Sequence, residues 1–262
     1  MHESSAPFTA ERRASGLAPV PLQAGSYSRR LLSRLRGRAH LVACDLSSLD
    51  SVRSAAEEIL ARAGAIDLLI HDAGRITRRR SLSADGHELT LAVNHLGPFL
   101  LTRLLQERMV PGGRIVVVGS TAHSRGRFDF EDMEMVHGYS WWRAYARSKL
   151  ANLLFAFALD RRLRGAGVRA DCVHPGVVRT NLAAGWSPAV AWAWRLLSPF
   201  FRSAREGAAP VLQATLSTEG GGRYFYRFQE ARPAAAALDE DLQERLWWWS
   251  EAAVERSRRP TA

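Results

Sequence analysis

The stretch Gly113-Arg-Ile-Val-Val-Val-Gly-Ser120 decides the fold. Its β-branched run ends at a glycine and a serine, a pattern typical of a buried strand that stops at a loop. The segment 142–163 has no glycine or proline, and its apolar residues recur at three- and four-residue steps, which predicts a helix. A buried strand of this kind suits an open parallel α/β sheet. Ligands of such sheets bind beyond the carboxyl ends of the strands, where Ser120 is placed.

Lys149 is the only lysine among the 36 Lys and Arg residues of the chain. It follows Tyr145 by four positions on the predicted helix, so both side chains share one face. A compact ammonium, unlike the planar guanidinium of arginine, fits a site that holds a phenol and a sugar hydroxyl. Such a cation would lower the pKa of Tyr145 and make it an acid/base catalyst. The alternative is an ordinary exposed Tyr/Lys pair.

Asn94 is a polar residue in an otherwise apolar helical segment, Leu89–Gln106. Its amide must find hydrogen-bonding partners there. A functional position and a satisfied asparagine in the core both remain open on this evidence alone.

Asn94, Ser120, Tyr145 and Lys149 resemble the catalytic tetrad of the short-chain dehydrogenase/reductase family. The segment His174-Pro-Gly-Val-Val-Arg-Thr180 is similar to the family's Pro-Gly motif, which lies against the nicotinamide. The local sequence around Asn94, Ser120 and Lys149 resembles that of the retinol dehydrogenase-like subgroup. The resemblance runs from about residue 39 to about residue 254.

The resemblance implies a doubly wound α/β fold, a parallel sheet with helices on both faces, and it implies a function. Tyr145 would exchange the proton with the substrate oxygen, Ser120 would hydrogen-bond that oxygen, Lys149 would bind the ribose, and Asn94 would hold a relay water. The reaction would be NAD(P)-dependent interconversion of an alcohol and a carbonyl on a hydrophobic retinoid-, steroid- or lipid-like substrate, with hydride transfer supplied by the cofactor. The residues expected to bind NAD or NADP are Asp45, Leu46, Asp72, Ala73, Gly74, Lys149, Pro175, Gly176, Val178 and Thr180.

The first 38 residues depart from this family pattern. They contain no apolar strand and no Gly-x-x-x-Gly-x-Gly turn, the element that lets a backbone and a helix N-terminus approach a pyrophosphate. We expect a short helix at Tyr27–Arg36, a first strand at Ala39–Cys44, and Ile66–Ile70 at the edge of a sheet that lacks the family's first one or two strands. Asp72 stands where the family has asparagine. Both departures predict weak dinucleotide binding.

Three explanations of this beginning stay open: a gene start placed too late or in the wrong frame, an Arg-rich mitochondrial-type leader, or a degenerate relative that acts as a binding or interaction protein without catalysis. The expected organisation is an irregular, Arg-rich segment 1–38 and a dehydrogenase-like domain 39–262.

The composition adds limits of a broader kind. The formal charge of +10 raises nucleic-acid or membrane-surface binding as a lesser alternative, but the arginines are dispersed and no recognition motif accompanies them, so no nucleic acid is expected.

Cys44 and Cys172 are predicted to be free thiols in buried strands, in a cytoplasmic protein with no metal site and no transmembrane run. The apolar segment Ala189–Phe201 stands where the resembled family keeps its substrate lid, and ordinary core packing and a weak interfacial contact with lipid are its alternatives. Trp247–Trp249 on a last helix, Leu238–Arg256, is expected to pack or to serve an oligomer contact, and the sequence leaves the oligomeric state open.

Overall fold

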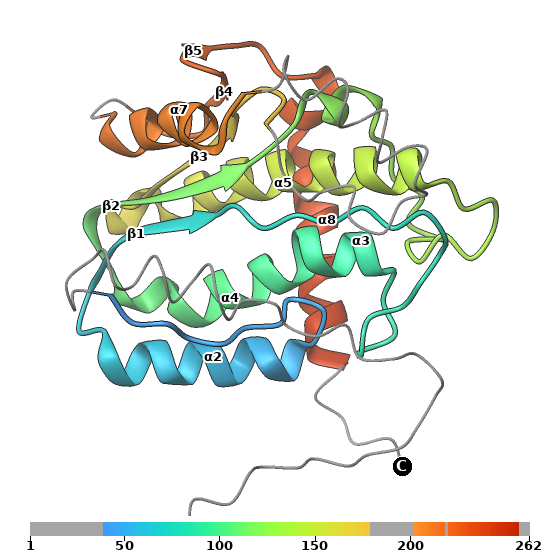
Figure 1. Cartoon of the computed structure of the whole chain (residues 1–262), viewed down its shortest axis with the longest axis horizontal. Coiled ribbons are helices and arrows are strands. Elements are labelled where there is room, and N and C mark those ends of the chain that lie inside the picture. The colour runs from blue at the N-terminus through green and yellow to red at the C-terminus, as the bar shows by residue number, and fades with distance from the viewer. Residues whose placement is uncertain (1–38, 179–201, 218–219, 257–262) are drawn as a thin grey trace, which may run out of the picture. The chain divides into compact units, whose positions relative to one another are not determined.

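Parallel strands at the centre of the chain form a sheet of order β1-β2-β3-β4-β5 (Figure 1). Strands β1 (Ile66–His71), β2 (Met109–Val118), β3 (Arg169–His174) and β4 (Tyr224–Tyr226) run parallel, and β5 (Gln229–Glu230) pairs antiparallel with β4. The predicted strand 113–120 is therefore confirmed over 113–118 as part of β2, and the α/β sheet architecture is confirmed with it.

The computed structural model describes residues 39–178, 202–217 and 220–256. The chain divides into two compact units, Met1–Leu41 and Val42–Ala262, and the second carries every element named below. The predicted helix Tyr27–Arg36, the predicted lid and Thr180 lie outside the described residues.

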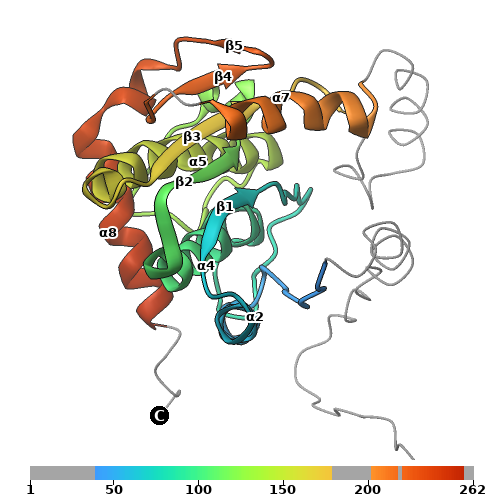
Figure 2. The ribbon, with the colours of Figure 1, turned by 90° about the vertical axis from the view of Figure 1, so that its left-hand side faces the viewer.

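The side chains of β2 alternate between two separate cores, as the pleat of a strand requires. Ile115 and Val117 join a core built with helices α4 (Gly97–Leu105), α5 (Trp141–Leu163) and α8 (Glu240–Arg256). Val116 and Val118 face the opposite side and pack against α7 (Ala204–Leu216). Helices thus cover both faces of the sheet (Figure 2), which explains why the strand reads as a continuous apolar run.

The segment predicted as one helix over 89–106 is built from four pieces. It begins as α3 (Leu89–Leu91), continues through a π-helical turn (Ala92–Leu96) into α4, and ends in a 3-10 turn (Gln106–Arg108). A π-turn inserts an extra residue into a helix and is frequent at functional sites. Asn94 lies within it.

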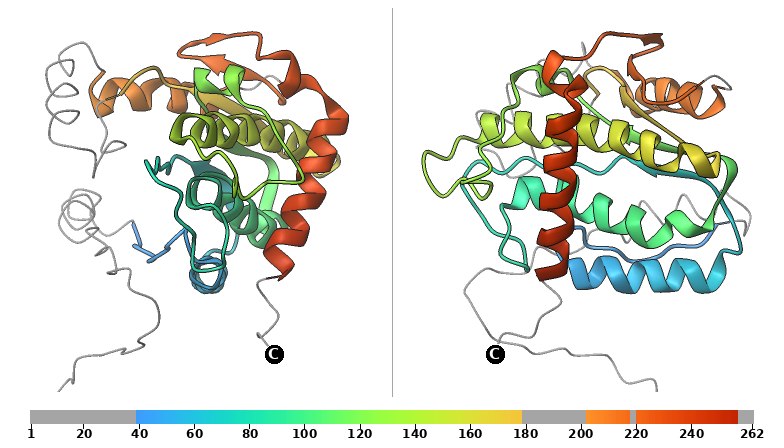
Figure 3. Two further views of the ribbon diagram at one scale, coloured as in Figure 1. Left: turned by 90° about the vertical axis from the view of Figure 1, so that its right-hand side faces the viewer. Right: turned by 180° about the vertical axis from the view of Figure 1, so that it is seen from behind.

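The outer helices complete the layers. Helix α2 (Leu49–Arg62) begins at the Ser48 cap and packs against α4. Helix α8 crosses α5 and runs toward α2 (Figure 3), where the Arg53 side chain donates to the Val254 carbonyl at 2.7 Å. The start of the predicted last helix, Leu238, belongs instead to a 3-10 turn (Ala235–Leu238). Trp247 is buried, so it packs as the sequence predicts, whereas Trp248 is exposed.

The predicted strand Ala39–Cys44 does not form, and this expectation is wrong. Residues 39–45 have no regular structure, because a strand needs a neighbour and none of the described strands pairs with them. Cys44 is consequently half-buried in an irregular segment, while Cys172 is buried in β3, and both thiols are free. Strand β1 lies at the end of the described sheet, as expected of Ile66–Ile70.

In the part of the chain that the structure describes, no helix is long and apolar enough to cross a membrane. The same described residues hold no group of three or more His, Cys, Asp or Glu side chains placed to bind a metal ion.

Candidate active site

Ser120 lies two residues beyond the carboxyl end of β2. Its hydroxyl caps the following 3-10 turn, Thr121–Arg125, by accepting from the Ala122 N–H at 3.2 Å. The preceding residue, Gly119, has no room for a side chain, because a Cβ there would lie 2.6 Å from the Cys172 Sγ. The strand therefore reaches Ser120 through a position that only glycine fits.

His123 holds the loop that carries Ser120. Its Nδ1 lies 2.6 Å from the Ser120 carbonyl oxygen, and the Ala234 N–H donates to its Nε2 at 3.1 Å. A carbonyl only accepts and a backbone N–H only donates, so these partners assign the proton to Nδ1. Burial lowers the pKa of His123. The hydrogen bond to the Ser120 carbonyl acts in the opposite direction and is the smaller effect. His123 thus ties the Ser120 loop to a distant part of the chain.

Tyr145 and Lys149 lie on α5, which the sequence predicts correctly. The Lys149 Nζ lies 5.9 Å from the centre of the Tyr145 ring and donates to the Val118 carbonyl at 2.9 Å. Among the described residues this carbonyl is its only hydrogen-bond acceptor, so the ammonium keeps two N–H groups for a ligand. Burial lowers the pKa of Lys149 to about 8, opposed by charges on Cys172 and Asp72.

The pKa of Tyr145 differs from the expectation that Lys149 lowers it. Burial raises this pKa above its ordinary value, and a hydrogen bond with the Ser120 side chain acts in the opposite direction. Lys149 is not a cause of this shift, and its ammonium donates to the Val118 carbonyl. The hydrogen bond with Ser120 brings the two side chains together, and their shared action on one substrate oxygen stays a prediction.

Asn94 is held from three directions. Its Oδ1 accepts from the Arg75 N–H at 2.7 Å, and its Nδ2 donates to the Arg75 carbonyl at 3.0 Å and to the Ser148 Oγ at 2.9 Å. Ser148 in turn donates to the Tyr145 carbonyl at 2.8 Å. Both amide hydrogens of Asn94 are therefore used within the chain, and its remaining capacity is one lone pair on Oδ1. The relay role of Asn94 stays a prediction.

Apart from Lys149 on α5, the described residues expected to bind the cofactor follow the two parallel strands β1 and β3 or precede α2. Asp72, Ala73 and Gly74 are exposed directly after β1, and Pro175, Gly176 and Val178 follow β3. Gly176 has a φ of +92°, which favours glycine. Because the carboxyl ends of parallel strands share one edge of the sheet, these groups lie at the same edge as Ser120.

Asp45 and Leu46 do not follow a described strand; they lie in the segment before α2. The Asp45 carboxylate accepts from the Ser47 N–H at 2.9 Å and from the Ser47 hydroxyl at 2.6 Å, and Leu46 packs against the core. These contacts shape the turn before α2. Their contribution to a cofactor site stays a prediction.

The sequence reasoning missed Ser148, Asn152 and Arg147 as parts of the site. The Asn152 Nδ2 donates to the same Val118 carbonyl as Lys149, at 3.2 Å. The spacing Lys149 to Asn152 places both on one helix face, a signal that was available. Arg147 offered a weaker signal, since one arginine among 35 does not stand out.

A short chain dehydrogenase family model matches residues 26–191. Human retinol dehydrogenase 12 is 43% identical over 209 residues, 78% of this chain, and mouse polyprenol dehydrogenase is 42% identical over 224 residues, 80% of this chain. The chain spans 66% of the length of each of these relatives. A crystal structure of a protein from Mycobacterium paratuberculosis is 34% identical, with a TM-score of 0.68 and coverage of 87% of this chain and 81% of that one. A blue fluorescent protein from a metagenomic library, solved with NADPH, is 27% identical, with a TM-score of 0.56 and coverage of 75% and 77%.

Proposed function

Because the chain belongs to the short-chain dehydrogenase family, with retinol dehydrogenases among its relatives, we propose that it interconverts an alcohol and a carbonyl on a hydrophobic substrate. NAD or NADP would be the hydride carrier. The observation that carries this proposal is the contact between the Ser120 hydroxyl and the Tyr145 phenol, with the buried Lys149 ammonium beside them.

The residues beyond the carboxyl ends of the parallel strands fit the nicotinamide end of such a cofactor. The Lys149 ammonium is buried and has two N–H groups left for hydroxyl oxygens, as a ribose would offer. The backbone at Gly176, with its positive φ, carries no side chain that would keep a flat ring away. When bound, the cofactor would supply the hydride.

The side chains would then handle the oxygen and its proton. Ser120 would donate a hydrogen bond to the carbonyl oxygen of the substrate and stabilise negative charge as it develops there. Tyr145 would deliver its proton to that oxygen in reduction and take it back in oxidation. Burial raises the pKa of Tyr145, so the phenol carries its proton at neutral pH.

A second candidate is a relative that binds without catalysing. Asp72 favours it, because an exposed carboxylate at this edge repels an anionic dinucleotide. Calorimetric titration of the full chain with NADH and with NADPH separates the two, and micromolar binding of either supports the enzyme.

Turnover is tested by the oxidation of that cofactor with decanal or all-trans-retinal as the substrate. Tyr145→Phe is expected to lower kcat by orders of magnitude, because the proton donor is lost, and to leave cofactor affinity within a few-fold. Tyr226→Phe, at an exposed phenol on β4, is the matched control and is expected to behave as wild type. Near-full turnover of Tyr145→Phe would remove Tyr145 from its assigned role.

A further inference from the structure

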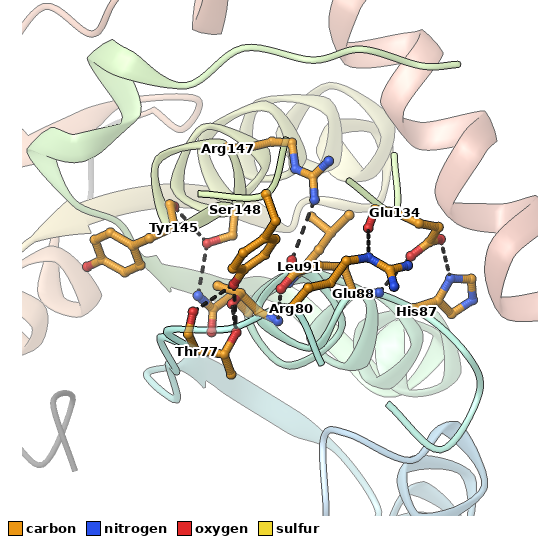
Figure 4. Close-up of polar contacts among 12 residues, drawn as sticks. Thr77, Arg80, His87, Glu88, Leu91, Glu134, Tyr145, Arg147 and Ser148 are labelled. Carbon is orange, nitrogen blue, oxygen red and sulfur yellow. Dashed lines mark hydrogen bonds and ion pairs between the residues drawn. The ribbon is translucent and has the colours of Figure 1, made fainter. Parts of the chain in front are cut away.

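Two buried charged side chains join the helical segments that carry three of the four catalytic candidates, Asn94, Tyr145 and Lys149. Glu88 directly precedes α3, six positions before Asn94, and Arg147 lies on α5 between Tyr145 and Lys149. The Arg147 guanidinium approaches the Glu88 Oε2 at 3.5 Å (Figure 4), and the two side chains are 3% and 0% exposed. The contact spans 59 positions of sequence.

Glu88 also starts the helix that leads to Asn94. Its Oε1 accepts from the Thr90 N–H at 2.8 Å and its Oε2 accepts from the Leu91 N–H at 2.9 Å. A carboxylate in this position satisfies helix N–H groups that have no partner within the helix, and it is favoured there by the helix dipole. One carboxylate therefore fixes the first turn of the Asn94 segment and faces a cation on α5.

A second polar link joins the same two segments. The Asn94 side chain donates to the Ser148 Oγ at 2.9 Å, one position after Arg147. Glu88–Arg147 and Asn94–Ser148 thus attach α5 to the Asn94 segment at two points. Two points fix both the separation and the rotation of one helix relative to the other, which a single contact does not.

The loop between Ser120 and Tyr145 is fastened to the same place (Figure 4). The Glu134 carboxylate accepts from the Glu88 N–H at 2.6 Å and lies 2.7 Å from the His87 Nδ1, while its carbonyl accepts from the Arg80 Nε at 2.8 Å. The Tyr139 hydroxyl donates to the Thr77 carbonyl at 2.7 Å. Glu88 is therefore a meeting point of three segments.

We propose that Glu88 and Arg147 are positioning residues, which hold the Asn94 segment and the Tyr145–Lys149 turn of α5 in the relative placement that the reaction needs. This inference rests on the proposed function for its catalytic consequence, but the placement itself can be measured without turnover. A buried ion pair is a poor source of stability, because desolvation of the two charges offsets their attraction, whereas breaking one partner is costly. A role in placement accounts for a pair kept at this junction.

The test removes the charges singly and together. Glu88→Gln and Arg147→Met each leave one uncompensated buried charge, so each is expected to lower the Tm by roughly 10 °C. The double variant Glu88→Gln/Arg147→Met has neither charge and is expected to regain much of that Tm. Glutamine keeps only one of the two acceptors that cap α3, so Glu88→Gln alone shows how much of any change comes from the lost cap. The matched control is Glu244→Gln/Arg161→Met, which removes a partly exposed ion pair of 3.1 Å between α5 and α8.

Two readouts of the double variant decide between stability and placement. Hydrogen exchange measured by mass spectrometry is expected to be faster in peptides covering 89–96 and 141–150, although the Tm has recovered. The kcat of the double variant for decanal with NADPH is expected to stay ten- to a hundredfold below that of the wild type, because small displacements of reacting groups are costly. The NADPH affinity of the double variant is expected to stay within a few-fold of the wild-type value. Recovery of wild-type exchange and kcat together with the Tm would overturn the proposal.

The exchange readout separates this proposal from the proposed function. If the wild type turns over no substrate, faster exchange in the double variant still supports placement, and unchanged exchange refutes it. If the double variant does not fold, Arg147→Lys takes its place, because it keeps the charge and changes the length and shape of the side chain. Wild-type exchange in Arg147→Lys would show that Arg147 only balances the charge of Glu88.

Discussion

Replacing Lys149 with methionine is expected to stabilise the fold while it removes a candidate catalytic cation. The lysine is 4% exposed, and burial lowers its pKa from 10.5 to about 8. One pKa unit corresponds to about 1.4 kcal/mol, so holding the buried charge costs the folded state about 3 kcal/mol below pH 8. Methionine occupies a similar volume and carries no charge.

The loss of the lysine hydrogen bond subtracts little from that gain. The Val118 carbonyl keeps a donor, because the Asn152 Nδ2 already lies 3.2 Å from it. We therefore expect Lys149→Met to raise the free energy of unfolding by about 1–3 kcal/mol at pH 7, once imperfect repacking is allowed for.

The gain has a definite pH dependence. At pH 7 the folded and unfolded chains both carry the Lys149 proton, so the penalty of the buried charge is complete. Between about pH 8 and 10.5 the unfolded chain still binds this proton and the folded chain has released it, which makes the wild type more stable as the pH rises. The advantage of the variant is therefore largest at pH 7 and shrinks toward pH 10.

Urea denaturation of both proteins at pH 7 and pH 9.5 measures the difference. Leu153→Met is the control, because it places methionine at a fully buried apolar position of the same helix and should show no such pH dependence. A Lys149→Met protein less stable than wild type at pH 7, or a difference that does not narrow at pH 9.5, would refute the reasoning.

Three other outcomes are expected. Lys149→Arg should lose turnover nearly as fully as Lys149→Met, because a guanidinium keeps the charge but not the compact geometry, and a wild-type kcat would contradict this. Gly126→Ala should destabilise the fold by about 1–3 kcal/mol, because a Cβ would lie 2.6 Å from the Ala146 carbonyl oxygen; urea denaturation against Gly165→Ala, where nothing lies within 4 Å, should show no such loss in the control. Iodoacetamide at pH 8 should alkylate the half-buried Cys44 before the fully buried Cys172, whose pKa burial raises to about 12; peptide mass spectrometry showing equal rates would rule this out.

The elements predicted correctly are those whose pattern is local. The run Ile115–Val118 faces apolar neighbours on both sides, so its composition alone indicates a buried strand. Helix α5 has a continuous helical period over its whole length. The strand predicted at Ala39–Cys44 has a similar local pattern, but a strand also needs a neighbouring strand, and no local pattern supplies one.

The parts of the candidate site that the sequence did not predict depend on distant contacts. The π-turn around Asn94 has the same apolar spacing as an ordinary helix, so periodicity does not reveal it. The partnership of Glu88 with Arg147 could not be read from either residue. The pKa of Tyr145 depends on how deeply the phenol is buried and on where the Lys149 ammonium is directed, and both follow only from the packed structure.

The bond between His123 and Ala234 gives the site a place in the order of biosynthesis. It spans 111 positions, so the residue that fastens the Ser120 loop is translated long after Ser120 itself. At roughly 5–20 residues per second, the ribosome needs roughly 5–20 s to add that length of chain. During that interval a nascent chain can hold Ser120, Tyr145 and Lys149 without the contact that fixes the serine loop. The fastening of the Ser120 loop is therefore coupled to synthesis of the C-terminal part of the protein.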